Sequence, residues 1–289
     1  MRSRINTTLF LFTLVLLGSM QTGCELINPD EEIPAFLCID TIGLAPSASE
    51  GNVFHNITDA WVFENEQLIG VFEIPAMVPI LKNGDANIRI RPGIKLNGQA
   101  GVRGVYLFAE DYVGTVTLAP DSVTCVNPIL PFKDFTTVPW KEDFDENAGI
   151  SLLTTDISEA DIVTVQGEEA FDGKTAVFRL PAGSSLFECR SSEWHELPSG
   201  GASVILEFTY KCNHPFRVGV FSDVPGGTIQ AAVIELIATD EWNHIYVNLS
   251  GVTSEFFTAS GFRPFFGFVR SGDFEDEINV YIDNIRLIY

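Results

Sequence analysis

Residue types that carry most enzyme chemistry are scarce in this chain of 289 residues. It has four histidines, His55, His195, His214 and His244. None of them lies in a hydrolase elbow or a metalloprotease motif. Glycosidases need two carboxyl groups roughly 5 to 10 Å apart, and with 39 acidic side chains such pairs arise by chance. The sequence therefore predicts no catalytic residue and a protein that is not an enzyme.

Four cysteines divide evenly between the two halves of the chain, as Cys38 with Cys125 and Cys189 with Cys212. An even count in each half favours two disulfides formed in an oxidising compartment. A bond between Cys38 and Cys125 would close a loop of about 86 residues, worth roughly 4 to 5 kcal/mol in the loop-entropy model. Four buried free thiols are one alternative. A zinc site is another, with thiolate and imidazole ligands from Cys189, His195, Cys212 and His214.

The N-terminus has the layout of a secretory signal over residues 1–23. Two arginines precede an apolar run, 9–17, which is too short to span a membrane. The pair Gly23-Cys24 that follows resembles the lipobox of bacterial lipoproteins, although Gln21 stands where leucine is usual. The resemblance implies that Cys24 is lipidated and that the protein belongs to the cell envelope. It would be an outer-membrane lipoprotein, on either the periplasmic or the surface-exposed face of that membrane. A soluble secreted protein is the alternative.

The charge of the chain excludes some partners. It has 17 basic and 39 acidic side chains and a net charge of −22. Such a surface repels nucleic acid and anionic membranes, so we expect no nucleic-acid partner and a membrane contact made through the lipid alone. Because 46% of the residues are hydrophobic, the acids are expected to cover folded domains. The acidic residues 24–35 predict a tether, in which Asp30, Glu31 and Glu32 loosely resemble a surface-export signal.

Residues 36–126 predict a small β-sandwich made of short strands. The polar residues 65–67 separate two apolar runs, which is typical of a β-hairpin. This segment resembles PEGA-type and carboxypeptidase-regulatory-type modules, which are Ig-like β-sandwiches, and the resemblance implies a spacer or surface-layer role. The expected strands cover residues 61–64, 68–72, 80–81, 86–91 and 112–118.

A second all-β domain is expected from residue 140 to residue 289. Residues 127–139 carry three prolines without a period and predict the linker between the two domains. Alternating apolar residues beyond the linker predict strands and no helix longer than a turn or two. The expected strands are 175–180, 203–210, 216–221, 231–237, 244–249, 265–269 and 280–288.

The order of three segments in this half, 142–145, 241–250 and 280–287, resembles jelly-roll, galactose-binding-like domains of the kind found as carbohydrate-binding modules. The resemblance implies a jelly-roll β-sandwich that binds carbohydrate or another envelope component. It also implies a structural Ca²⁺ held by Asp143 or Asp145 together with Asp283, because calcium prefers carboxylate and carbonyl oxygens. The alternative is that Asp283 only caps a turn.

Sugar rings stack on exposed aromatic faces framed by polar groups. Trp194 is the best candidate, because polar residues surround it in a segment with no strand pattern, and His195, Tyr210 and His214 are the further ligand-binding candidates. The alternative for Trp194 is a loop anchor.

The sequence thus predicts a lipid-anchored, non-catalytic envelope protein that binds a glycan or an envelope protein. A structural subunit of an envelope assembly and a glycoside-active enzyme are the alternatives.

Overall fold

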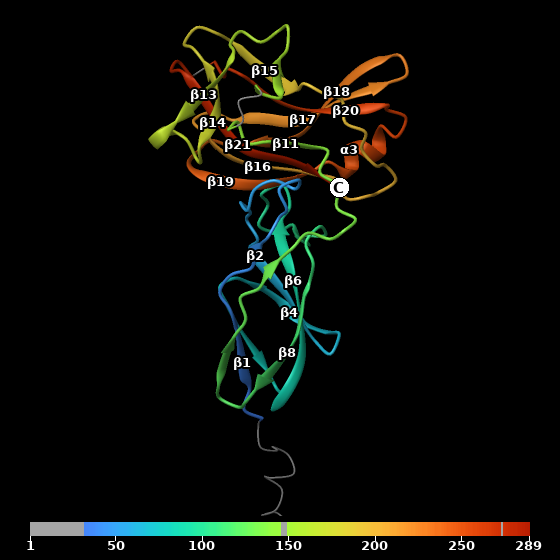
Figure 1. Ribbon diagram of the computed structural model, residues 1–289. Coiled ribbons are helices and arrows are strands. Elements are labelled where there is room, and N and C mark those ends of the chain that lie inside the picture. Colours follow the sequence, from blue (N-terminus) through green and yellow to red (C-terminus); the bar gives the residue numbers. More distant parts are fainter. Residues whose placement is uncertain (1–31, 146–148, 273) are drawn as a thin grey trace, which may run out of the picture.

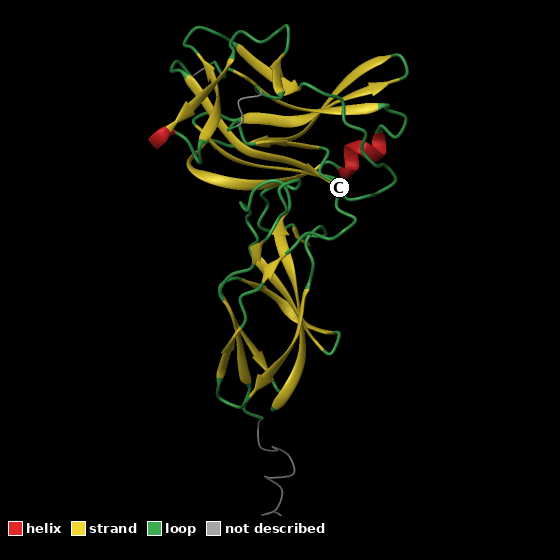
Figure 2. Ribbon diagram, viewed as in Figure 1, coloured by secondary structure: helices red, strands yellow, loops and turns green. Residues whose placement is uncertain are grey.

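The computed structural model describes residues 32–145, 149–272 and 274–289, which fold almost entirely into strands (Figure 2). The all-β class is confirmed. Cys24, the signal segment and most of the tether lie outside the described residues. Within the described part of the chain, no helix has the length and apolar character needed to cross a membrane.

The first domain is a sandwich of short strands. A five-stranded sheet has the order β4-β3-β6-β7 with β8 on β6, a three-stranded sheet has the order β5-β1-β9, and β10 pairs with β2. The expected hairpin joins β3 to β4 through Asn65 and Glu66, both at positive φ, which matches the twist of the strands. The strands are β1 Ala35–Ile39, β2 Gly43–Leu44, β3 Asp59–Glu64, β4 Gln67–Glu73, β5 Ala76–Ile80, β6 Gly84–Lys95, β7 Arg103–Val105, β8 Tyr112–Leu118, β9 Val123–Cys125 and β10 Ile129–Leu130.

The second domain packs two sheets around a core rich in phenylalanine. One sheet, which we call the joint sheet, has the order β13-β14-β21-β16-β19 with β11 on β21. The other, which we call the groove sheet, has the order β12-β15-β20-β17-β18. A short helix, α3 (Ser250–Glu255), and a 3₁₀ turn, Gly167–Glu169, complete it. The strands are β11 Trp140–Glu142, β12 Leu152–Thr154, β13 Ile162–Gln166, β14 Lys174–Leu180, β15 Leu186–Ser191, β16 Ile205–Cys212, β17 Phe216–Val224, β18 Gly227–Leu236, β19 Thr239–Asn248, β20 Gly261–Val269 and β21 Ile278–Ile288.

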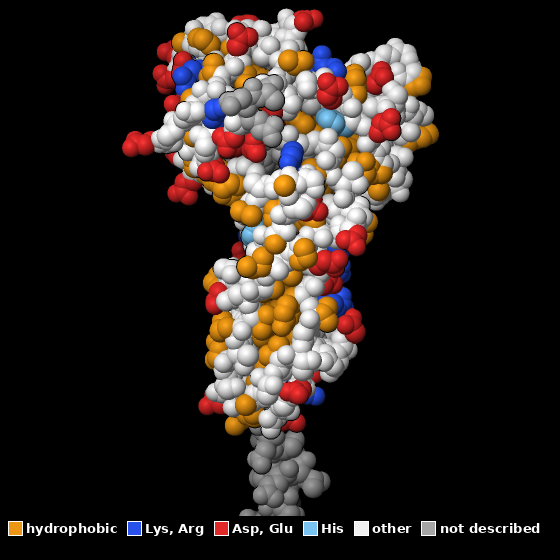
Figure 3. Space-filling model, in the orientation of Figure 1, with side chains coloured by type: hydrophobic (Ala, Val, Ile, Leu, Met, Phe, Trp, Pro, Cys, Tyr) orange, Lys and Arg blue, Asp and Glu red, His pale blue; other side chains and the backbone are white. Residues whose placement is uncertain are grey.

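The two domains are stacked end to end (Figure 1). Strand β1 begins at the end of the first domain that is remote from the second domain. The joint sheet lies next to the first domain, and the groove sheet lies beyond it. Acidic side chains are spread over the visible face of the second domain, where basic ones are few (Figure 3).

The alternation of side chains along β16 explains why the first domain docks on the joint sheet. Leu206 and Phe208 point into the core of the second domain, so their neighbours point to the opposite face. On that face Ile205, together with Tyr246 of β19, joins the apolar core of the first domain. The apolar core of the first domain therefore extends onto the outward face of the joint sheet.

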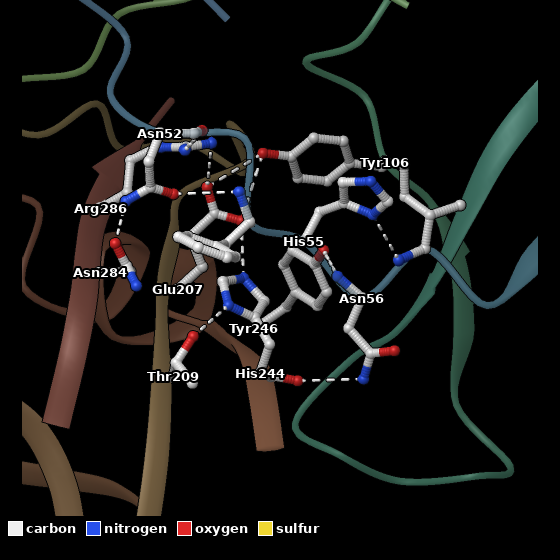
Figure 4. Close-up of polar contacts among 12 residues, drawn as sticks. Asn52, His55, Asn56, Tyr106, Glu207, Thr209, His244, Tyr246, Asn284 and Arg286 are labelled. Atoms are coloured by element: carbon white, nitrogen blue, oxygen red, sulfur yellow. Dashed lines mark hydrogen bonds and ion pairs between the residues drawn. The ribbon is translucent and has the colours of Figure 1, made fainter. Parts of the chain in front are cut away.

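A buried charge lies in this contact (Figure 4). Glu207 is 1% exposed, and its Oε1 lies 3.0 Å from Nη1 of Arg286. Tyr106 of the first domain donates its hydroxyl to the same oxygen at 3.1 Å, and Nε2 of His244 lies 3.7 Å from Oε2. Burial alone would raise the pKa of Glu207, but Arg286, with His244 and Tyr106, outweighs it and holds that pKa below its usual range.

Further hydrogen bonds join backbone atoms of the first domain to the second domain. Arg286 donates to the carbonyl oxygen of Asn52 at 2.6 Å, and the N–H of Asn56 donates to the hydroxyl of Tyr246 at 2.8 Å. The N–H of Asn97 donates to the carbonyl oxygen of Tyr246, also at 2.8 Å. Separating the domains would remove these partners from Arg286, Tyr246 and the three asparagine backbones, so the contacts favour one orientation of the two domains.

The segment 127–139 differs from the expected linker. Residues Ile129–Leu130 form β10, and Phe132 packs in the first core. Thr137 exchanges two backbone hydrogen bonds with Tyr289 at the end of β21. The prolines mark an irregular path, but the apolar residues between them are bound to the fold, and the first domain extends past residue 126.

We expect Arg286→Met to lower the free energy of unfolding by about 3 to 5 kcal/mol, because it leaves Glu207 buried without its charged partner. Urea unfolding of the full chain measures this. Arg217→Met is the matched control, because Arg217 pairs with Glu235 in the open and an exposed pair contributes about 0 to 1 kcal/mol. Adding Glu207→Gln to Arg286→Met should recover part of the loss. Equal effects of the two arginine variants would contradict this role of Glu207.

Candidate functional site

The outer face of the groove sheet gathers polar and aromatic side chains. Phe187 on β15 and Phe266 on β20 point into the core. Because side chains alternate along a strand, the residues next to each phenylalanine point outward. On β20 this places Arg263 and Phe265 on the outer face. Phe265 is 3% exposed without belonging to the core; it forms the floor of the face, with the ring of Phe221 at 5.2 Å.

This face is hollowed at its centre. Gly219 and Gly267 occupy outward positions on β17 and β20, and a Cβ on Gly219 would meet the Phe265 ring at 2.6 Å. Glu188 of β15 accepts a hydrogen bond from the side chain of Gln230 on β18, although β20 and β17 lie between those strands. Side chains from distant strands can meet only if the sheet curls toward them, so the outer face is concave.

The Glu188–Gln230 bridge separates two hollows. The histidine hollow has a volume of about 450 Å³, and the tryptophan hollow about 440 Å³. Both volumes lie in the usual range of ligand sites. The histidine hollow is lined by His214, Arg217, Glu235, Phe265, Phe268 and Ser271, and the tryptophan hollow by Thr155, Arg190, Trp194, Phe221, Thr228 and Arg263.

Charged groups in the two hollows differ in their partners. Arg217 is bound to Glu235 at 2.9 Å in the histidine hollow. In the tryptophan hollow, the Arg263 guanidinium lies 4.5 Å from the centre of the Trp194 ring and donates to the carbonyl oxygen of Ser192 at 2.7 Å. Glu188 is held by Thr155, whose hydroxyl donates to Oε1 at 2.9 Å. The groove thus combines an aromatic side, a fixed carboxylate and cations.

The structure does not bring the four sugar-binding candidates together. Trp194 is 38% exposed and lines the tryptophan hollow. His214 is buried but lines the histidine hollow, where its Nδ1 is 2.8 Å from the carbonyl oxygen of Pro215. His195 and Tyr210 do not reach the groove: His195 is buried and stacks on Trp140, and Tyr210 belongs to the core. Alternation along β16 explains the error for Tyr210, which follows Leu206 and Phe208 inward.

Sequence reasoning missed the strand that supplies much of the site. β15 carries Glu188 and Arg190, and no expected strand covered it. Gln230, Arg263 and Phe221 lie at outward positions of strands that were expected, at least in part. Their alternation with inward apolar residues, such as Val220 on β17 and Phe262 on β20, was the available signal.

The aspartates proposed for calcium do not form a cluster of three. Among the described residues, the ligand atoms of Asp143, Asp145 and Asp283 do not all lie within 4.8 Å of one another, although the charge of Asp145 contributes to the raised pKa of Asp283. Asp283 is buried, and it accepts hydrogen bonds from the hydroxyl of Thr175 at 2.6 Å and from the N–H of Asn284 at 2.7 Å. These donors occupy its oxygens, which favours the alternative role as a local cap. Calcium binding itself stays a prediction.

The four described cysteines, Cys38, Cys125, Cys189 and Cys212, are not bonded to one another in this structure. Cys38 and Cys125 stand opposite each other on β1 and β9, where a bond between them stays a prediction. Their thiols and the Asp40 carboxylate lie within 4.8 Å of one another. Cys189 and Cys212 are buried on opposite sheets of the second domain. In the described part of the chain they do not cluster with His195 and His214, so the zinc alternative has no support.

Comparisons with known proteins give similarities of structure only. No family model and no curated protein matches the chain. The CBM22-1 xylan-binding domain of Xyn10C from Paenibacillus barcinonensis is 13% identical over 52% of this chain and 93% of its own length, with a TM-score of 0.38. A family 30 carbohydrate-binding module of a cellulosomal cellulase from Clostridium thermocellum is 17% identical over 54% of this chain and 94% of its own, with a TM-score of 0.37. A family 11 module from Clostridium thermocellum, in complex with a mixed-linked tetrasaccharide, is 11% identical over 51% and 94%, with a TM-score of 0.34. At these values the similarity adds nothing to the groove's own geometry about what this chain binds.

We expect Asp283 to make the second domain less stable as the pH rises from about 4 to 7. Burial raises the pKa of Asp283 from 3.8 to about 7, against the hydrogen bonds that lower it. In this range the folded state keeps a proton that the unfolded state has lost, so unfolding is favoured with increasing pH. Melting temperatures of the wild type and Asp283→Asn between pH 4 and pH 8 measure the effect. The melting temperature of the wild type relative to that of Asp283→Asn should fall as the pH rises through this range and level off above pH 7. A difference in melting temperature that does not change with pH would contradict the raised pKa.

Proposed function

We propose that this protein binds carbohydrate in the groove on the outer face of the groove sheet, and that a lipid on Cys24 anchors it to the outer membrane. The observation that carries the first part is the concave face with two hollows. It offers aromatic side chains, a fixed carboxylate and an amide side by side, and these are the groups that sugar rings and hydroxyls require.

The polar groups of the groove are suited to hydroxyl-rich ligands. Glu188 and Gln230 together present both acceptor and donor capacity, and their mutual hydrogen bond holds them in place. A sugar hydroxyl can donate to one and accept from the other. Such a preformed arrangement lowers the cost of ordering side chains on binding.

The stacking of the domains supports the anchoring role. The first domain joins the second domain through the joint sheet, and the groove is on the opposite sheet (Figure 1). Because β1 begins at the remote end of the first domain, an N-terminal lipid would hold the membrane at that end. The groove would then face away from the membrane, with the first domain as a spacer.

We expect Trp194→Ala to weaken glycan binding by about tenfold or more, equivalent to roughly 1.4 kcal/mol, because Trp194 is the exposed tryptophan of the groove. Binding of the full mature chain to a glycan array, followed by calorimetry on the ligands found, measures this. Trp242→Ala is the matched control, since Trp242 lies on the joint sheet, packed with Phe171 and Tyr281. A chain that binds no glycan on the array, or two variants with equal losses, would contradict a carbohydrate site here.

We expect Cys24→Ala to release the protein from the membrane fraction, because it removes the site of acylation and nothing else is proposed to reach the bilayer. Cell fractionation with detection of the full chain is the measurement. Cys125→Ala, which removes an exposed thiol of the first domain, should leave the protein with the membranes. Continued membrane association of Cys24→Ala would rule out the lipid anchor.

A further inference from the structure

Two arginines of the groove lack the acidic partner that other arginines of this acidic protein have. Of the described arginines, those paired with a carboxylate are Arg89, Arg91, Arg103, Arg179, Arg217 and Arg286. Arg270 instead donates to five backbone carbonyl oxygens. The two that remain, Arg190 and Arg263, both line the tryptophan hollow.

The two guanidinium groups have unused donors. In the described chain the side chain of Arg190 makes neither a hydrogen bond nor an ion pair, and its Nη1 is buried without a partner. Nε of Arg263 is also buried without a partner. A buried donor without an acceptor destabilises the free protein, so a ligand that accepts from these atoms gains affinity.

Strand register places the two arginines on one face, side by side. Arg190 stands opposite Phe265 on β20, and Arg263 precedes Phe265 by two residues, so both side chains emerge outward as diagonal neighbours. The Trp194 ring against Arg263 adds a flat apolar side to the hollow. An anion attached to a sugar ring fits this combination, because the guanidinium fork matches a carboxylate and the ring can lie against an aromatic side chain.

We infer that the tryptophan hollow recognises the carboxylate of a uronic acid unit, so that the groove prefers acidic polysaccharides to neutral ones. This inference rests on the proposed carbohydrate binding and names its ligand class. Arg190 is the specificity-determining residue, and Arg263 the second cation that holds the same carboxylate.

The acidic surface and the acids of the hollow do not cancel this preference. At physiological salt the Debye length is about 8 Å, so exposed charges farther away are largely screened. Within the hollow, Glu188 keeps its negative charge, but its two oxygens accept from the neutral side chains of Gln230 and Thr155, and Asp156 forms no ion pair with either arginine in the described chain. The carboxylate of a ligand therefore meets two guanidinium groups whose charge no acid of the hollow pairs with.

The test compares matched sugars on the full mature chain by calorimetry. The probes are oligosaccharides of galacturonic, mannuronic and glucuronic acid, each beside its carboxyl-reduced counterpart, with neutral xylan and β-glucan oligosaccharides. We expect one acid form or more to bind about tenfold or more tightly than its reduced form. Arg190→Gln should abolish this difference, whereas Arg179→Gln on the joint sheet, whose arginine pairs with Glu169, should keep it.

The outcomes separate this inference from the proposed function. Equal affinity for acid and reduced forms, or binding of the neutral oligosaccharides alone, would overturn the preference for uronic acid and leave carbohydrate binding intact. A preference for acid forms that survives Arg190→Gln would also overturn it, because the charge would then be recognised elsewhere. Failure to bind any acidic or neutral glycan would end both.

Discussion

The alternation of side chains in the two sheets of the second domain is the constraint on which the rest of the structure depends. Each sheet must bury one face in the common phenylalanine-rich core, and this leaves one outward face on each sheet. The joint sheet uses its outward face to dock the first domain. The groove sheet uses its own to form the two hollows. The joint and the proposed binding groove are therefore on opposite sides of one core and share no residues.

The ion pair of the joint fixes an orientation more than it adds stability. A buried ion pair such as Glu207–Arg286 costs desolvation free energy comparable to what its attraction returns. Its effect is that other arrangements of the domains would leave a buried carboxylate without Arg286 and Tyr106. Since Asn52, Asn56 and Asn97 add backbone contacts across the same interface, the direction in which the groove faces follows from the joint.

The fold was predictable from the sequence wherever alternation was long. Strand β8 was expected with its observed limits, and β14, β17 and β21 were expected within a few residues, because each has apolar residues at every second position. Strand β15 was missed because outward Glu188 and Arg190 flank inward Cys189 without a longer apolar pattern. The segment 127–139 was taken for a linker because proline signals irregular backbone and does not show whether neighbours such as Phe132 are buried.

The site was only partly predictable, since proximity between strands cannot be counted along the chain. Trp194 was found from local context alone, and it does lie at the groove. His195 follows Trp194 in sequence and Tyr210 is close to His214, but neither side chain reaches the groove. His195 packs on Trp140 and Tyr210 points into the core. Glu188 and Gln230 meet only because the groove sheet curls over Gly219 and Gly267. That curvature is a property of the whole sheet, and it turns separate polar residues of four strands into one concave surface with unpaired arginines on one side.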